Sequence, residues 1–139
     1  MRRFTRTDAS PSQPQRTGRR LTDLLIWLHG GEIAYYCEEV QDAILAFPAR
    51  LQARYIHLTE RMETFGPDLG MPHTRAMGKG LFELHMKAKG GIGRVLFCHR
   101  PVRRIMMLHA FVKKSAKTPA RELKLARKRM KEVQANDDA

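Results

Sequence analysis

The chain has 139 residues, of which 42% are hydrophobic, and its formal net charge is +12. This length supports one compact domain with a core but not two, and no apolar run approaches the ~18 residues that a membrane-spanning helix needs. The composition therefore excludes a membrane-spanning protein and predicts a soluble, cytoplasmic one. Its charge calls for a polyanionic partner without showing which.

The positive charge is concentrated in two segments. Residues 1–20 contain six Arg and one Asp, and residues 112–132 contain nine Lys or Arg and two Glu, whereas the rest of the chain is neutral overall. Residues 1–20 also contain almost no large apolar side chains, so little burial would offset the entropy lost on ordering them. We expect them to form a disordered basic arm.

The part of the chain that follows predicts a strand and two helices. Ile33–Cys37 is rich in residues that suit a strand, and the acidic stretch Glu38–Phe47 has a helical pattern. A second helix is predicted from Pro48 to Gly66, because its apolar residues recur at spacings of three and four. These residues form one apolar stripe: Leu51, Tyr55, Leu58, Met62 and Phe65.

The second half of the chain predicts three strands and a last helix. After a loop rich in Gly and Pro, the strand candidates are Leu81–Lys87, Ile92–His99 and Arg104–Val112. Thr118 is expected to cap the helix, with Pro119 in its first turn. The order β-α-α-β-β-β-α implies an α+β fold, with a small, antiparallel-dominated sheet and helices packed on one face.

The strands separate into apolar and polar registers, because successive side chains point to opposite faces of a sheet. The polar register holds Glu83, His85, Lys87, Arg94, His109 and Lys113. If helices cover only one face, these residues share the face that is open to water. Such a face can be merely solvated, but two imidazoles and several cations beside the Lys-rich segment 113–117 favour a phosphodiester backbone as its ligand.

Cleavage of RNA without a metal requires three events, which His, Lys and Arg can all support. The 2′-hydroxyl loses its proton, the charge on phosphorus is stabilised, and the 5′ leaving oxygen is protonated. Arg94 would neutralise the phosphorane through its guanidinium fork, while His85, His109 or a Lys would move protons. The residues leave the choice of acid and base open.

Motifs for other chemistries are absent. Cys37 and Cys98 stand apart in apolar stretches, and the six His lack metal-ligand spacing. No Walker loop, dinucleotide-binding glycine pattern or nucleophile elbow occurs. We therefore expect neither a metal nor another cofactor.

Several segments together resemble one known family, the phage-derived toxins of the RelE/HigB type. They are GPDLGMPH at 66–73, GLFEL at 80–84, Arg94-Val95, LHAFVKK at 108–114 and KTP at 117–119. The Lys-Lys-x-x-Lys-Thr-Pro run before a basic helix is the most diagnostic of them. The resemblance covers roughly residues 32–133. It predicts an N-terminal extension over residues 1–31, a toxin domain over 32–134 and a tail over 135–139.

The resemblance implies a fold and a biological role. It implies a RelE-like fold and the toxin of a type II toxin-antitoxin system, a metal-independent endoribonuclease (mRNA interferase) that cleaves mRNA in the ribosomal A site and inhibits translation. The implied partners are the ribosome with its mRNA and a helix-turn-helix antitoxin. Operator DNA would be bound only through that antitoxin.

The resemblance also indicates site residues. Active surfaces of related toxins match Lys87 and Lys89, Arg94, and Lys113 and Lys114, and Glu83 matches the family motif. Together with the polar register, this predicts catalytic roles for His85, Lys87, Arg94, Lys113 and Lys114, and RNA binding by Glu83, Lys89, His109 and Lys117. Many relatives have Arg in place of His85, and a Tyr that some place near the last helix has no counterpart here, so the acid and base stay unassigned.

A second hypothesis is a basic nucleic-acid-binding protein without catalysis, either a degenerate toxin or a phage factor. The charge of +12 and the basic arm motivate it. This hypothesis predicts strong, salt-sensitive binding without cleavage, whereas the toxin hypothesis predicts that Arg94→Ala abolishes toxicity in a folded protein.

Overall fold

The computed structural model describes residues 32–138, except residues 90 and 116 and the side chains of residues 137 and 138. The predicted basic arm and the rest of the extension over residues 1–31 lie outside these residues. The elements in chain order are β1 (Glu32–Tyr35), α2 (Glu38–Leu45), α3 (Ala49–Phe65), β2 (Thr74–Gly78), β3 (Leu81–Ala88), β4 (Gly91–Arg100), β5 (Arg104–Lys113) and α4 (Ala120–Asp138).

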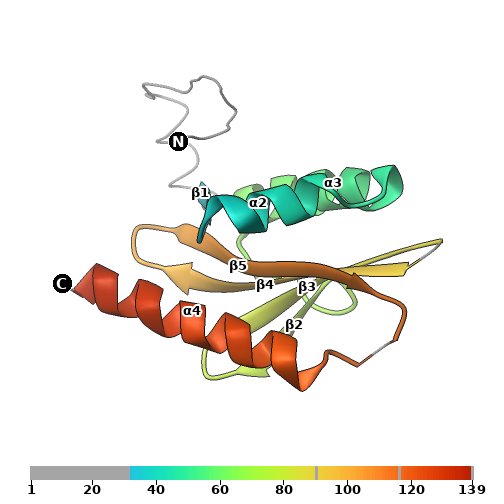
Figure 1. Cartoon of the computed structure of the whole chain (residues 1–139). Coiled ribbons are helices and arrows are strands. Elements are labelled where there is room, and N and C mark those ends of the chain that lie inside the picture. Colours follow the sequence, from blue (N-terminus) through green and yellow to red (C-terminus); the bar gives the residue numbers. More distant parts are fainter. Residues whose placement is uncertain (1–31, 90, 116, 139) are drawn as a thin grey trace.

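The strands form one five-stranded mixed sheet in the order β1-β5-β4-β3-β2 (Figure 1). β1 pairs with β5 in parallel, and the other three pairings are antiparallel. The predicted α+β class and the antiparallel-dominated sheet are therefore confirmed.

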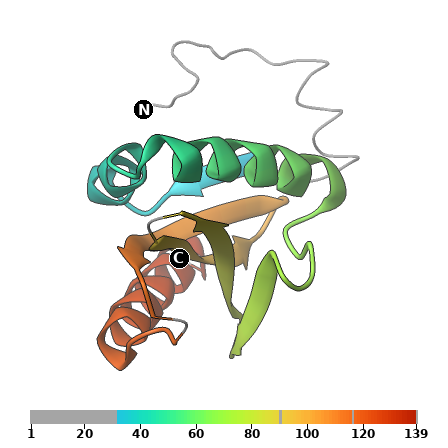
Figure 2. The ribbon, with the colours of Figure 1, turned by 90° about the vertical axis from the view of Figure 1, so that its right-hand side faces the viewer.

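Helices cover both faces of the sheet, so the prediction that they pack on one face is wrong (Figures 1 and 2). Val95 and Phe97 of β4 pack with the core beneath α2 and α3, whereas Leu96 and Cys98 pack with the core beneath α4. A continuous apolar run such as Val95–Cys98 is typical of a strand buried on both faces. The last helix is drawn onto the second face because that face also needs cover.

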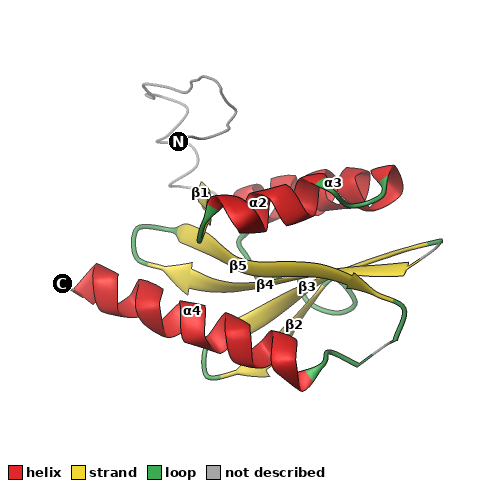
Figure 3. Ribbon diagram, in the orientation of Figure 1, coloured by secondary structure: helices red, strands yellow, loops and turns green. Residues whose placement is uncertain are grey.

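The sheet contains one strand more than predicted. β2 pairs with β3 along the sheet edge, in a segment that we expected to be loop (Figure 3). Of its five residues only Thr74 is buried, so the strand has no apolar alternation by which it could be recognised.

The last helix is longer than predicted. α4 continues to Asp138, so residues 135–138, which we expected to form a tail, are helical.

A bulge in β5 changes which side chains face α4. Leu96 pairs with His109 and Phe97 with Met107, which leaves Leu108 as the extra residue. Leu108 packs with the core beneath α4, while Ala110 packs with the core beneath α2 and α3. The bulge therefore puts Leu108 and Ala110 on opposite faces, although strict alternation along a strand would put them on the same face.

The helix α3 uses the apolar stripe that its spacing predicted, and α4 buries a stripe of its own. Leu51, Tyr55, Leu58 and Met62 of α3 are buried, whereas Phe65, the last residue of that helix, is 75% exposed. Ala126, Met130 and Val133 of α4 are buried against the opposite face of the sheet. The domain is thus a three-layer arrangement with two separate apolar cores, one on each side of the sheet.

Candidate functional site

Strand register brings the predicted polar residues onto one face, the side of the sheet that α4 covers in part. His85 pairs with Arg94, which pairs with Phe111, and in the next row Lys87 pairs with Ile92, which pairs with Lys113. A third row contains Glu83, Leu96 and His109. Directly paired residues on neighbouring strands point to the same side, so the six residues of the polar register share a face as predicted.

Arg94 and Glu83 lie inside the protein rather than on an open surface. Both side chains are 0% exposed. Arg94 Nη2 donates a hydrogen bond to the carbonyl oxygen of Ser115, and Nη1 donates to Thr118 Oγ1 at 3.4 Å. The Thr118 hydroxyl donates to Glu83 Oε2, and Arg75 Nη2 donates to Glu83 Oε1 at 2.9 Å. We call the buried residues Glu83, Arg94 and Thr118, together with the exposed Arg75 and Ser115 that bind to them, the buried network.

The buried network joins two of the inner strands, β3 and β4, to the edge strand β2 and to the segment before α4. Desolvation lowers the pKa of Arg94, the nearby Glu83 carboxylate raises it, and Arg75 lowers it further. The guanidinium nevertheless stays charged, because arginine does not lose its proton in proteins. Arg94 Nε is buried and has no hydrogen-bond partner. Among the described residues, it is the only buried side-chain nitrogen or oxygen without one. Arg94, predicted to contact a phosphate, thus binds protein groups in this structure.

The exposed part of the candidate site lies where β3 turns into β4 and where β5 ends. Lys87, Lys89, Lys114 and Lys117 are exposed, and Lys113 is half-buried. Because Lys87 and Lys113 occupy the same cross-strand row, the predicted basic residues are brought to one end of the sheet. A phosphate chain could approach this end, since no described helix covers Lys87.

His85 lies between the buried network and this basic end. Its side chain is half-buried, and burial is the largest cause that lowers its pKa. The charges of Arg94, Arg75 and Lys87 lower the pKa further, while Glu83 opposes them. A histidine shifted in this direction is neutral at pH 7 and can accept a proton.

His109 is separated from His85 and belongs to a different local arrangement. Its Nε2 is 2.7 Å from Glu122 Oε1, in the first turn of α4, and its ring contacts Phe111 with centroids 5.4 Å apart. β4 lies between the two histidine strands, so their backbones are about 10 Å apart at ~4.8 Å per strand spacing. The two imidazoles that the sequence offered, beside the lysines, as proton carriers are not adjacent.

Sequence reasoning missed four partners of the predicted residues: Arg75, Ser115, Thr118 and Glu122. Thr118 was expected to cap α4, but its hydroxyl donates to Glu83 instead, and the Pro119 carbonyl accepts the first helical hydrogen bonds from Glu122 and Leu123. One feature of the sequence indicates that such partners exist. Glu83 and Arg94 stand between apolar residues in inner strands, and buried charges at such positions require internal partners.

Within residues 32–138, apart from the two gaps, no group of three His, Cys, Asp or Glu side chains could hold a metal ion. In the same residues no helix is both long and apolar enough to cross a membrane.

Comparison with protein-family models places the site within a known family. Residues 42–131 match the family described as phage derived protein Gp49-like (DUF891). The chain belongs to this family. The matched segment begins within α2 and ends within α4, so it contains every candidate site residue of this Gp49-like protein. A search of curated proteins found no match.

Two histidines with lowered pKa values predict acid sensitivity of this Gp49-like protein. Burial lowers the pKa of His85 and also that of His99, where Asp68 opposes the shift. Between the unfolded value near 6.5 and the lower folded values, the unfolded chain binds more protons. Stability from these groups is therefore full above pH ~6.5 and is lost as the pH falls through the folded pKa values.

The measurement is urea unfolding at pH 7.5 and pH 5.5. We expect His85→Gln/His99→Gln to lose less stability than the wild type between these two pH values. His57→Gln, on the exposed side of α3, controls for the removal of a histidine. An unchanged pH dependence in the double variant would contradict the prediction.

Proposed function

We propose that this Gp49-like protein is the toxin of a type II toxin-antitoxin system and acts as a metal-independent endoribonuclease on mRNA in the ribosomal A site. The observation that carries the proposal is the convergence of His85, Lys87 and Lys113 on one end of one sheet face, beside the exposed Lys89, Lys114 and Lys117. Membership of a phage-derived family supports it. The resemblance to RelE/HigB-type toxins supports the choice of reaction.

In the proposed reaction His85 acts as the general base. Neutral His85 accepts the proton of a 2′-hydroxyl, and the 2′-oxygen attacks the adjacent phosphorus. The P–O5′ bond breaks, leaving a 2′,3′-cyclic phosphate and a 5′-hydroxyl. The ammonium groups of Lys87 and Lys113 stabilise the charge on the phosphorane, and one of them donates the proton that the 5′-oxygen needs.

Arg94 supports this reaction from inside the protein. Its hydrogen bonds to Ser115 and Thr118 hold the chain that follows β5, and that chain carries Lys114 and Lys117. Its charge also lowers the pKa of His85, which keeps the proposed base unprotonated at neutral pH. In this proposal Arg94 is a positioning residue and does not touch RNA.

The proposed partners follow from the proposed toxin function. The exposed lysines meet mRNA on the ribosome, and a helix-turn-helix antitoxin restrains the toxin and carries it to operator DNA. The proposed compartment is the cytoplasm, where translation takes place.

A second candidate function is nucleic-acid binding without cleavage. One observation favours it: Arg94, predicted from the sequence to neutralise the phosphorane, is buried and already bound to protein groups. If His85 and the lysines do not suffice for chemistry, the same basic end would hold RNA and release it intact.

The test is induction of the gene in a bacterial host, followed by mapping of transcript 5′ ends on translated and untranslated messages. We expect new ends inside translated frames only, and we expect Lys87→Gln/Lys113→Gln to abolish them. Arg50→Gln/Arg54→Gln, on the exposed side of α3, removes the same charge elsewhere and should still cleave. Arg94→Ala is unsuitable here, because the loss of a buried network residue perturbs folding. Intact messages in cells that hold soluble wild-type protein would favour the binding function.

A further inference from the structure

The outward side of α4 carries a row of cations that the candidate site does not use. Arg121, Lys124, Lys128 and Lys131 are all exposed, and we call them the basic stripe. Their spacings of three, four and three residues put them on one side of the helix. At ~1.5 Å per residue the stripe is about 15 Å long.

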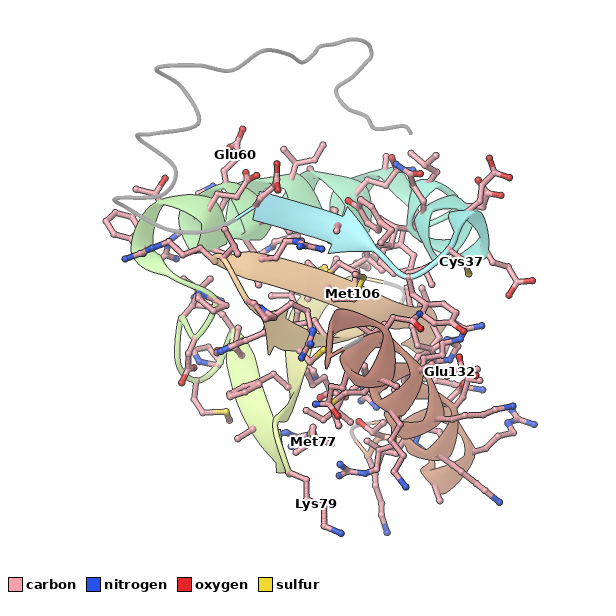
Figure 4. The ribbon with its side chains drawn as sticks, turned by 90° about the vertical axis from the view of Figure 1, so that its left-hand side faces the viewer. Cys37, Glu60, Met77, Lys79, Met106 and Glu132 are labelled. Carbon is pink, nitrogen blue, oxygen red and sulfur yellow. The ribbon has the colours of Figure 1, made fainter. Side chains whose placement is uncertain are left out.

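The other basic residues of α4 have structural partners. Arg127 donates to the carbonyl oxygens of Met77 at 2.7 Å and Gly78 at 3.0 Å, and so binds α4 to the turn after β2. Arg129 donates to the carbonyl oxygen of Leu108 at 2.8 Å and contacts Glu39 at 3.3 Å. The helix thus uses two arginines to hold its position and turns the basic stripe away from the sheet. Figure 4 shows nitrogen-tipped side chains that fan out from α4 on this side.

The two described carboxylates of α4, Glu122 and Glu132, are bound to residues outside the basic stripe. Glu122 is paired with His109, and Glu132 accepts a hydrogen bond from the Tyr36 hydroxyl. Among the side chains described between residues 32 and 136, none forms an ion pair with the four stripe residues. Merely solvated helix faces usually mix Glu with Lys at these spacings, whereas like charges three or four residues apart destabilise a helix. A bound polyanion would remove that repulsion.

We propose that the basic stripe binds the phosphate backbone of double-stranded RNA. The stripe contains no aromatic side chain on which an unpaired base could stack, which argues against a single strand as its ligand. A row of cations along one side of a helix suits the backbone of a duplex, and duplex RNA is recognised mainly through shape and phosphate contacts. The choice of RNA over DNA rests on the proposed function, since ribosomal RNA helices surround the A site.

Neighbouring cations extend this surface at both of its borders. Lys117 precedes α4 and is exposed. Lys79, labelled in Figure 4, follows Gly78, whose carbonyl oxygen Arg127 binds, so the turn between β2 and β3 adds a second positive edge beside the helix. The basic stripe and the candidate site therefore form two RNA-facing surfaces joined by the Lys-rich segment 113–117.

The test compares two triple variants that both lower the formal net charge from +12 to +9. One is Lys124→Gln/Lys128→Gln/Lys131→Gln in the basic stripe, and the other is Arg50→Gln/Arg54→Gln/Arg61→Gln on α3, across the sheet. Gln has nearly the helix propensity of Lys and Arg, so both proteins should fold, which circular dichroism and urea unfolding check. Binding to a 16-base-pair RNA duplex, to the DNA duplex of the same sequence and to one RNA strand is measured at several salt concentrations.

The expected result is a change in the salt dependence of duplex RNA binding. Each lost phosphate contact lowers the slope of log affinity against log salt by about 0.9, so the stripe variant should lose about 2 to 3 and the α3 variant less than 1. The effect should be smaller on DNA and on the single strand. Equal losses in both variants, no loss in the stripe variant, or an equal loss on DNA or single-stranded RNA would overturn the proposal. Binding to a duplex is measured without cleavage, so this outcome is independent of the transcript mapping that tests the proposed function.

Discussion

Replacing Glu83 by leucine is expected to lower the free energy of unfolding by about 3–5 kcal/mol, the cost of leaving a buried charge without its partner. Glu83 is 0% exposed and receives hydrogen bonds from Arg75 and Thr118, and its charge lies near Arg94, which is also 0% exposed. Without this carboxylate the guanidinium of Arg94 stays buried with no compensating negative charge. Urea unfolding of the wild type and of Glu83→Leu at pH 7 measures the difference.

A double-mutant cycle separates this effect from the loss of packing. Arg94→Met removes the cation that Glu83→Leu leaves without a partner. The loss of stability in Glu83→Leu/Arg94→Met should therefore be smaller than the sum of the losses in the two single variants. Glu60→Leu is the control, because Glu60 lies on the outer side of α3 and is exposed (Figure 4). Its substitution should change the stability by no more than about 0.5 kcal/mol. A loss below about 1 kcal/mol in Glu83→Leu, or strict additivity in the cycle, would show that the buried network is not a coupled unit.

His85→Gln is expected to reduce RNA cleavage by about 10²- to 10⁴-fold, the usual contribution of a general base, while the protein stays folded. The rate of the wild type should fall on the acidic side as His85 becomes protonated. Because burial and three nearby cations lower the pKa of His85, the midpoint of this fall should lie below pH 6.5. Cleavage of translated mRNA by purified protein on ribosomes, followed from pH 5 to pH 8, measures both effects.

His99→Gln is the matched control for this experiment. The pKa of His99 is also lowered by burial, but its ring stacks on Phe82, which packs against the core beneath α2 and α3. That substitution should leave cleavage and its pH profile unchanged. A His85→Gln protein that cleaves within about twofold of the wild type, or an acidic midpoint above pH 6.5, would exclude His85 as the base.

The parts of the fold that could be predicted are those with a strong local pattern. The apolar stripe of α3 and the alternation in β3 placed both elements to within about one residue of their observed ends. β2 could not be predicted in this way, because it is stabilised by pairing with β3 and exposes most of its side chains. The side on which α4 packs was also hidden, since it depends on Leu96 and Cys98 being buried together on the far face of β4.

The sequence was enough to predict which face of the sheet the site residues occupy, but not how deeply each of them is buried. Alternation along the strands was enough to place His85, Arg94 and Lys113 on one face, and the observed register agrees. Burial of Arg94 depends on Ser115 and Thr118, which return to the sheet only after β5 has ended. These contacts join residues more than twenty positions apart, so a local sequence pattern cannot predict them.

The position of β1 has a consequence for how this protein is made. Glu32–Tyr35 pair with residues 104–107, so the first described strand finds its neighbour only after some seventy further residues have been added. Contacts this distant in sequence slow folding and form late, when both partners have left the exit tunnel. The lysine-bearing end of the sheet also needs Thr118 beside Glu83. The sheet edge at β1 and the lysine-bearing end are therefore both completed only when synthesis of the chain is nearly finished.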